Sequence, residues 1–480
     1  MRASAPPSRL WLLVLCVLPV GVLLAIFIGW RLTNSSAVRR LEREARRQGE
    51  PLTLSELALT YAPVPDEQNA AIPLMESWEA DEPEFWRAFR AGKSRLPQRT
   101  HRQPSYSPAL PLLGSDARYP SRTQPLPESS RSAAETFLEM NAPRRFAVIE
   151  ALRREQCRFP IRMELGAMTL LPHLAELKPQ AQIFRIESLV ASDRHQNDAA
   201  IDALEHVLLT ANLLKDEPIL ISQLVRIACV MMALDGAEHL LSRTALTPAQ
   251  LDRLQRLFES SRLEGALRRA FVGERAFALN AFELSGETLA AAGPSDGDDP
   301  VDPDTEEARY RKGMTVFRVI GIESIDRRLM LETLNEAVAL TEKDTPEAWK
   351  RLAELFDEAA DKARGFPPKI FSRLLLPALS KAGNKFAQLE ARRRAGLAAI
   401  GVERYRSARG QLPQGLDELT PEFLASVPTD PFDAKPLRFR QRPVGFVVYS
   451  IGVDRTDDGG AERLRKGPVK NFDVTFVVER

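Results

Sequence analysis

The hydrophobic positions begin with an uninterrupted apolar run near the start of the chain. Residues 10–30 read LWLLVLCVLPVGVLLAIFIGW, which is 21 residues without a charged side chain. A helix of that length spans about 30 Å, the thickness of the hydrocarbon core of a bilayer. The pattern therefore predicts a transmembrane helix over residues 10–30, preceded by a short N-terminal tail, residues 1–9.

A cleaved signal peptide is the alternative interpretation of this run. Ser35, Ser36 and Ala37 are small enough to form a cleavage site. However, the apolar run is longer than a typical signal-peptide core, and Arg31 separates it from that site. We therefore expect an uncleaved anchor that crosses the membrane once.

The segment that follows, residues 31–95, has the pattern of a juxtamembrane helical region. A charged helix is expected over 37–48, and Thr53 with Glu56 forms a capping box that starts another helix. Residues 96–131 are rich in proline and serine and show little periodicity. This composition predicts a long loop.

Residues 132–385 predict an α-helical domain. Two helices, 181–191 and 198–214, form a hairpin that resembles a tetratricopeptide pair in shape, although no clean repeat of about 34 residues is present. Residues 219–234 are apolar almost all round, which predicts a central, buried helix. The domain therefore reads as stacked helical hairpins, interrupted by an acidic loop at 291–307.

The periodicity changes in the last part of the chain, residues 386–480. A helix is expected over 389–409 and should end at Gly410. Runs rich in β-branched and aromatic residues then predict three strands, at 437–440, 446–450 and 472–478. The predicted fold class is mainly α, with an N-terminal transmembrane helix, a large helical domain and a small α+β C-terminal domain.

The overall charge argues against one class of partner. The chain has 66 basic and 65 acidic side chains, so its net charge is close to zero. Proteins that bind nucleic acid usually present a strong positive field. We therefore expect no nucleic-acid partner.

The cysteines give little sign of a redox or metal function. Cys157 and Cys229 have no CxxC neighbour and no metal-ligand spacing. Cys229 lies in an apolar run and is expected to be a buried thiol. A disulfide between the two is the alternative if the domain lies outside the cytoplasm.

No catalytic motif stands out. None of the five histidines has a ligand-pair spacing, and neither a dinucleotide nor a Walker glycine motif occurs. A G-x-S-x-G match at 293–297 lies in the acidic loop without the strand that a nucleophile elbow needs. The aspartates of residues 296–304 could bind a hard cation, but a solvated linker is favoured. We therefore expect no catalytic and no organic cofactor-binding residues.

The C-terminal segment carries a resemblance to a known architecture. Its pieces are ERYR followed by GQLP, the turn LDEL with FL after it, DPFDAKP, YSIGVD, a loop rich in aspartate and glycine, and FDV close to the end. With these pieces, residues 386–480 resemble the globular domain of type II secretion major pseudopilins, which are related to type IV pilins. DPFDAKP stands where that family has a turn similar to DPWGNP. The rest of the chain is not recognised.

The resemblance implies a calcium site. In such pseudopilins the aspartate-rich loop after the Y-S-x-G-x-D strand binds calcium, which implies that Asp454, Asp457, Asp458 and Asp473 are ligands here. Calcium takes about six to eight oxygen ligands, and glycines allow the loop to offer backbone carbonyls as well. The alternative is a solvated loop whose aspartates cap turns, and Arg455 interrupts the ligand pattern.

Two departures from the family argue that the chain is not a filament subunit. About 355 residues separate the apolar run from the C-terminal domain, and no Gly-Phe-Thr-Leu-x-Glu processing sequence precedes the run. We therefore expect a membrane-anchored envelope protein with a structural or protein-interaction role, linked to a secretion or pilus-like apparatus. The resemblance places it in the bacterial inner membrane with its large domain in the periplasm.

Other interpretations stay open at this point. The arginines after the apolar run would favour a cytoplasmic domain under the positive-inside rule, and the chain would then be a cytoplasm-facing helical-repeat adaptor. However, Arg39 and the following arginines belong to a predicted helix in which Glu42 and Glu44 alternate with them. A further alternative is a hydrolase-type enzyme with a carboxylate site in the helical domain.

Overall fold

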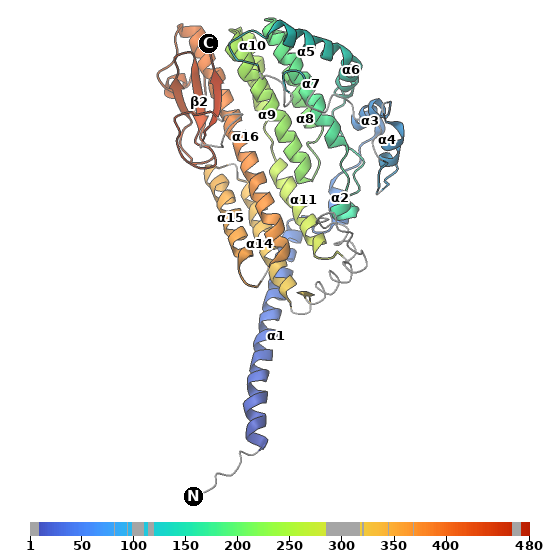
Figure 1. Cartoon of the computed structure of the whole chain (residues 1–480). Coiled ribbons are helices and arrows are strands. Elements are labelled where there is room, and N and C mark those ends of the chain that lie inside the picture. Colours follow the sequence, from blue (N-terminus) through green and yellow to red (C-terminus); the bar gives the residue numbers. More distant parts are fainter. Residues whose placement is uncertain are drawn as a thin grey trace.

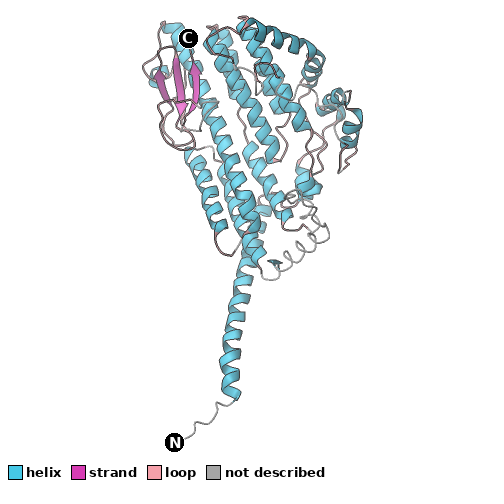
Figure 2. Ribbon diagram, in the orientation of Figure 1, coloured by secondary structure: helices cyan, strands magenta, loops and turns pink. Residues whose placement is uncertain are grey.

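Long helices make up most of the structure, a computed structural model of the chain, and a small sheet lies beside them (Figure 1, Figure 2). The mainly helical fold class, with a long apolar N-terminal helix and a small C-terminal sheet, is confirmed. The structure describes the following residues: 9–80, 82–93, 95–97, 110–113, 120–284, 317–318, 321–343, 345–367, 369–462 and 472–480. The acidic loop 291–307 and the G-x-S-x-G match lie outside them.

The helices follow one another in this order: α1 (Arg9–Arg47), α2 (Leu54–Thr60), α3 (Ala71–Glu79), α4 (Pro83–Arg90), α5 (Glu128–Met140), α6 (Ala142–Ala151), α7 (His173–Asp193), α8 (Asn197–Asn212), α9 (Leu220–Arg243), α10 (Pro248–Ser260), α11 (Ala266–Ala281), α14 (Ile322–Thr341), α15 (Pro346–Arg364) and α16 (Ile370–Arg409). Short 3₁₀ turns are η1 (Asp66–Gln68), η3 (Met163–Met168) and η4 (Leu416–Leu419). The strands are β1 (Arg438–Gln441), β2 (Phe446–Ser450) and β3 (Val474–Val478).

α1 is one continuous helix where the sequence pattern predicted two, a span over 10–30 and a charged helix over 37–48. The polar stretch between them does not break the helix. The side chains of Thr33, Asn34 and Ser36 donate hydrogen bonds of 2.8–2.9 Å to carbonyls three or four residues earlier in the same helix. Such bonds satisfy the polar groups without a cap, so the helix continues.

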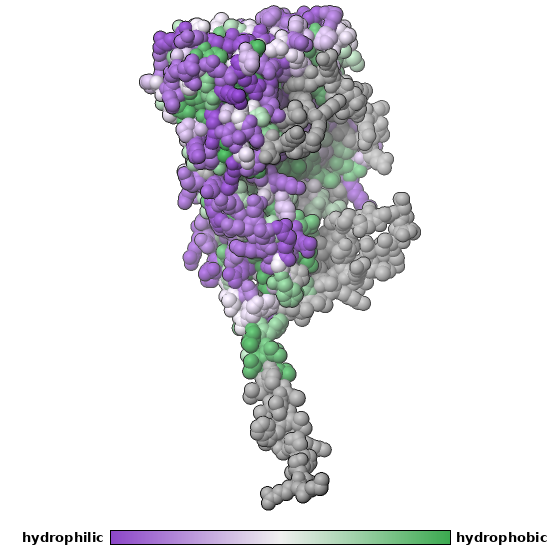
Figure 3. Space-filling view, turned by 60° about the vertical axis from the view of Figure 1, so that its left-hand side comes forward, coloured by the Kyte–Doolittle hydropathy of each residue, from purple (hydrophilic) through white to green (hydrophobic). Residues whose placement is uncertain are grey.

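The two halves of α1 have different surroundings. Apolar side chains between Val20 and Leu32 are exposed, with Val20 at 63% and Leu23 at 65%. In the second half, Val38, Leu41 and Ala45 are buried in a small core that includes side chains of α11 and α14. Figure 3 shows the hydrophobic section of α1 below a body whose visible face is mostly hydrophilic. An exposed, apolar section of α1 therefore projects from the folded body.

α7, α8 and α9 pack together as the centre of the body (Figure 1). α7 and α8 form the predicted hairpin, and α9 contains the predicted central helix 219–234. Within the described residues, α9 and Val20–Arg47 are long and apolar enough to cross a membrane. However, 67% of the apolar window of α9 is buried inside the protein, as expected for a core helix.

Local signals in the sequence placed several helix ends correctly. The capping box predicted at Thr53 forms at the start of α2, and Thr247 with Gln250 forms another at the start of α10. α16 ends at Gly410, whose φ of 71° lies in the left-handed region that glycine adopts easily. α16 starts at Ile370, however, so the predicted domain boundary between residues 385 and 386 lies inside a helix.

The three strands form an antiparallel sheet in the order β1-β2-β3, and the predicted strands are confirmed. In the register of the sheet, Val448 of β2 lies between Phe439 of β1 and Phe476 of β3. The sheet packs on α16 and β3 also contacts α9. Phe446, Val448 and Phe476 belong to the same core cluster as the buried residues of the helices. The sheet and the helical body therefore share one core.

A buried carboxylate holds the sheet on the helices. Glu238 of α9 is 3% exposed, and it accepts a hydrogen bond of 2.6 Å from the backbone N–H of Val477 in β3. The same carboxylate pairs with Arg392 of α16, and Arg122 lies 3.7 Å from it. Arg122 comes from the predicted loop 96–131, so part of that loop is built into the body.

Other parts of the predicted loop are also packed. Leu110, Leu112 and Leu126 are buried against α7. Cys157 and Cys229 are both buried as free thiols, so the alternative of a disulfide between them is wrong. Burial raises the pKa of the Cys229 thiol to about 12, which keeps it protonated at neutral pH.

Two helical glycines give a test of this packing. A Cβ atom at Gly273 of α11 would lie 1.7 Å from the carbonyl oxygen of Pro218, whereas one at Gly383 of α16 would lie 3.9 Å from its nearest neighbour, on Leu352. We expect Gly273→Ala to lower the free energy of unfolding by about 1–3 kcal/mol, because the backbone must move. Unfolding of the detergent-solubilised chain, followed by far-UV circular dichroism, measures this change.

Gly383→Ala is the matched control. Alanine favours helix over glycine by up to about 1 kcal/mol, so this variant should be as stable as the original chain or more stable. Equal destabilisation by both variants would contradict the close contact between α11 and Pro218.

Candidate functional site

Asp430, in the DPFDAKP turn, is a buried polar residue of the C-terminal segment. Its side chain is fully buried and accepts hydrogen bonds from the N–H groups of Phe432 (2.9 Å) and Ile451 (3.0 Å) and from the hydroxyl of Ser450 (2.8 Å). Arg438 also pairs with it at 2.7 Å. These donors tie the turn to the end of β2. The sequence predicts the turn, but no pattern in it indicates a role for this carboxylate.

Of the four aspartates in the predicted calcium set, Asp473 is the most buried, at 2% exposure. Its carboxylate accepts hydrogen bonds from the N–H groups of Gly460 (2.7 Å) and Asp458 (3.4 Å). Burial raises the pKa of Asp473 above its usual range, and the nearby charges of Asp457 and Asp458 add to this shift. Asp457 and Asp458 therefore lie near enough to Asp473 for their charges to act on it.

The other aspartates of the set also bind local backbone. Asp457 accepts a hydrogen bond of 2.9 Å from the N–H of Gly459, and exposed Asp454 accepts one of 3.2 Å from Thr456. Both bonds reach two residues ahead, as in an Asx turn. For these two residues the structure shows the turn-capping role that the sequence left as the alternative.

The fit of this loop to calcium is incomplete. One carboxylate oxygen of Asp458 is buried and receives no hydrogen bond from the described residues, which suits a cation. However, within the described residues no group of three or more His, Cys, Asp or Glu side chains is placed so that it could hold a metal. Residues 463–471 of the same loop lie outside the described residues. The calcium ligand set stays a prediction.

A second polar grouping lies deep in the helical body. The Nε2 atom of His173 is 2.9 Å from a carboxylate oxygen of Glu217, and these residues are 0% and 1% exposed. His173 stacks on Phe159 with ring centroids 4.3 Å apart. Burial and the charge of Glu217 raise the pKa of Cys157 well above its usual value. A protonated thiol is a poor nucleophile, so Cys157 is not suited to nucleophilic attack at neutral pH.

This grouping had no signal in the sequence. Cys157, His173 and Glu217 come from separate segments and match no spacing motif. A histidine beside an acid is the feature that would favour the hydrolase alternative, yet the pair is sealed from solvent.

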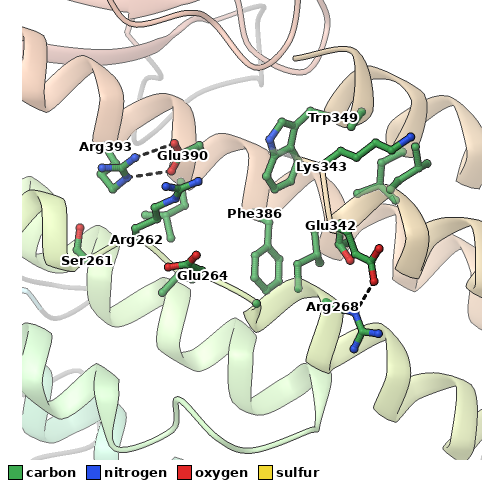
Figure 4. A pocket seen from close by; sticks show the side chains of 18 residues that line it. Ser261, Arg262, Glu264, Arg268, Glu342, Lys343, Trp349, Phe386, Glu390 and Arg393 are labelled. Carbon is green, nitrogen blue, oxygen red and sulfur yellow. Dashed lines mark hydrogen bonds and ion pairs between the residues drawn. The ribbon is translucent and has the colours of Figure 1, made fainter. Parts of the chain in front are cut away.

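An open cavity of about 190 Å³ lies between the α10–α11 connection, the end of α14, the start of α15 and the middle of α16. Figure 4 shows Trp349 and Phe386 facing this space. Ion pairs border it on both sides, with Arg393 bound to Glu390 through two hydrogen bonds of 2.8–2.9 Å and Arg268 bound to Glu342 at 3.2 Å (Figure 4).

The charges of the cavity suit binding better than acid catalysis. Although Glu390 is partly buried, the guanidinium groups of Arg393 and Arg394 lower the pKa of its carboxyl below the usual range. Glu390 therefore stays ionised at neutral pH and cannot serve as a general acid. The aromatic walls and the bordering charges would suit a small amphipathic ligand.

Comparisons of the chain with protein-family models, with curated proteins and with solved structures find no match. The resemblance of residues 386–480 to pseudopilins therefore depends on the sequence pieces quoted above.

Asp473 allows a test of the two roles proposed for the aspartate loop. We expect Asp473→Ala to destabilise the chain by about 1–3 kcal/mol in the presence of a chelator, because the buried N–H of Gly460 and the partly buried N–H of Asp458 lose their acceptor. Asp454→Ala is the control and should have little effect, since its carboxylate is exposed. Thermal unfolding in detergent measures both variants.

A calcium titration by the same method tests the ligand set. A rise in the unfolding midpoint that is reduced by Asp→Asn changes at positions 454, 457, 458 and 473 would establish calcium binding. If calcium produces no rise in the original chain, the ligand set implied by the resemblance is wrong.

Proposed function

We propose that the protein is a single-pass membrane protein of the bacterial envelope with a structural or protein-interaction role. The observation that carries this proposal is the division of α1, in which residues 20–32 are exposed and mostly apolar and the second half is part of the folded core. An exposed apolar helix is unfavourable in water and stable in a bilayer. The body is thus joined to the span by continuous helix.

The surroundings of the candidate cleavage site support an anchor over a cleaved signal peptide. Ser35–Ala37 lie between Asn34 and Val38, and both flanking residues are buried. The side chain of Asn34 also accepts a hydrogen bond of 3.4 Å from Arg328 of α14. A peptidase would need to release this part of α1 from the body before it could cut an extended chain.

The side of the membrane is also part of the proposal. Arg46 pairs with Glu56 at 2.6 Å, and Glu42 of α1 pairs with Arg327 of α14 at 3.0 Å. The section of α1 that carries most of the arginines after the span is therefore part of the folded body, and Arg46 is in an ion pair there, which weakens these arginines as a topology signal. Together with the pseudopilin resemblance, this favours a body outside the cytoplasm, anchored in the inner membrane.

The interaction role follows from how the C-terminal sheet is presented. The sheet lies at the end of the body away from the exit of α1 (Figure 1). In the proposed arrangement, α16 holds this pseudopilin-like module at a fixed distance from the membrane, where it can contact a component of a secretion or pilus-like apparatus. We propose a non-catalytic role because the pair of His173 and Glu217 is sealed and Glu390 is held in ion pairs.

A doubly tagged chain tests the anchor and its orientation together. With an N-terminal epitope and alkaline phosphatase fused after Arg480, we expect both tags on one membrane-bound band that resists alkaline carbonate, with active phosphatase. The phosphatase folds only outside the cytoplasm, so its activity reports the side.

Each alternative gives a different result in this experiment. A soluble phosphatase band without the epitope would indicate a cleaved signal peptide. A membrane-bound band with inactive phosphatase would indicate the cytoplasm-facing adaptor.

Affinity capture tests the interaction role. We expect the cross-linked and detergent-solubilised full chain to recover envelope components that residues 1–33, fused to an unrelated soluble domain, do not recover. The control keeps the span and removes the body, so the difference reports contacts of the body. Equal recovery by both baits would contradict the proposed role.

A further inference from the structure

The turn between α15 and α16 lies at the end of the body from which α1 emerges (Figure 1). Contacts between α14 and α1 connect the two places. A Cβ atom added at Gly321, at the start of α14, would lie 3.4 Å from Arg31 and 3.7 Å from Trp30 of α1. The start of α14 therefore touches α1 where its apolar run ends.

α14 in turn fixes the start of α16. The buried carboxylate of Asp326 accepts hydrogen bonds from the N–H groups of Phe371 (2.8 Å) and Ser372 (3.0 Å), in the first turn of α16. Phe371 also packs its ring on Phe282 and Phe317. The segment just before α16 is thus held close to the level of Trp30.

This segment exposes large apolar side chains. Phe366 is 95% exposed, Ile370 52% and Leu374 72%. Ile370 and Leu374 are four residues apart, so they lie on one face of α16, and Phe366 lies in the turn that precedes this helix. A side chain as large as Phe366 held almost entirely in water is costly unless something covers it.

The same segment is strongly basic. Residues 361–374 read DKARGFPPKIFSRL, with four cations and one acid. The acid is Asp361, and it pairs with Arg364. Lys369 folds back onto the carbonyls of Lys362 and Pro367, at 2.9 and 3.2 Å, and Arg373 is exposed on the first turn of α16.

We propose that the α15–α16 turn is a second membrane contact, which binds the surface of the bilayer that α1 enters. This inference depends on α1 as an anchor. Phe366 and Ile370 enter the interfacial layer beside Trp30, where aromatic side chains are favoured. Lys369 and Arg373 face the phosphates of anionic lipids, which attract basic segments next to a span.

The position of the turn next to α1 is what selects the bilayer as its occupant. A protein partner would not require these apolar side chains to lie close to the end of the span. It would also not require cations next to them. With two contacts, the body is fixed in its tilt relative to the membrane as well as in its distance.

A lipid-quenching experiment on the full chain in nanodiscs tests the contact. In a Cys16→Ala background the remaining native thiols, Cys157 and Cys229, are buried, so Phe366→Cys can carry an environment-sensitive fluorophore. We expect lipids with a spin label near the headgroup to remove most of its fluorescence. Met140→Cys is the matched control, because Met140 is 77% exposed on α5, at the opposite end of the body, and should not be quenched.

The charges give a second measurement on the same label. Quenching at position 366 should be stronger in anionic than in neutral nanodiscs, and Lys369→Glu with Arg373→Glu should remove that difference. Equal quenching in both lipids before the change would contradict the role of the two cations.

The outcomes separate this contact from the anchor. If the chain resists carbonate extraction but the label at position 366 is not quenched, the second contact is wrong and the anchor still stands. If carbonate extracts the chain, the anchor itself is wrong. If the fluorophore reports an apolar environment but is not quenched by the lipids, a protein surface covers the turn, and the inference is also wrong.

Discussion

The buried carboxylate of Glu238 is the interaction on which the arrangement of the C-terminal half depends. It joins three elements that are far apart in the sequence, because it belongs to α9, pairs with Arg392 of α16 and accepts the N–H of Val477 in β3. A buried charge is stable only when it is paired and hydrogen-bonded. The sheet therefore has one position on the helices, and Arg480 reinforces it by pairing with Glu403 and donating to the carbonyl of Leu241.

What the sequence predicted well was local. Capping boxes, the glycine at the end of α16, the apolar surface of α9 and the strand runs all depend on residues within a few positions of one another. The continuity of α1 was missed because side chains that usually cap a helix bond here to carbonyls within it. The long start of α16 was missed for a different reason, since the domain boundary was placed from the C-terminal resemblance.

The polar sites also divide into local contacts, which the sequence indicated, and contacts between distant segments, which it did not. The turn-capping bonds of Asp454 and Asp457 reach two residues ahead, and the sequence offered them as an alternative. Asp430, Glu238 and the pair of His173 with Glu217 depend on distant segments, and no spacing in the sequence reports them. Arg122 is the clearest case, because a residue in a proline-rich stretch reaches both Glu238 and Glu462.

The continuity of α1 has a mechanical consequence for the proposed anchor. A flexible linker would let the body reorient freely, whereas α1 continues into the core as one helix, so the proposed anchor would turn together with the body. α16, with 40 residues, is about 60 Å long, and a change of about 10° in the tilt of the anchor would carry the far end of the body sideways by about 10 Å. In the proposed arrangement, a small change in bilayer thickness or lateral pressure that tilts α1 would thus displace the sheet by a much larger distance than the lipid-facing end of the body.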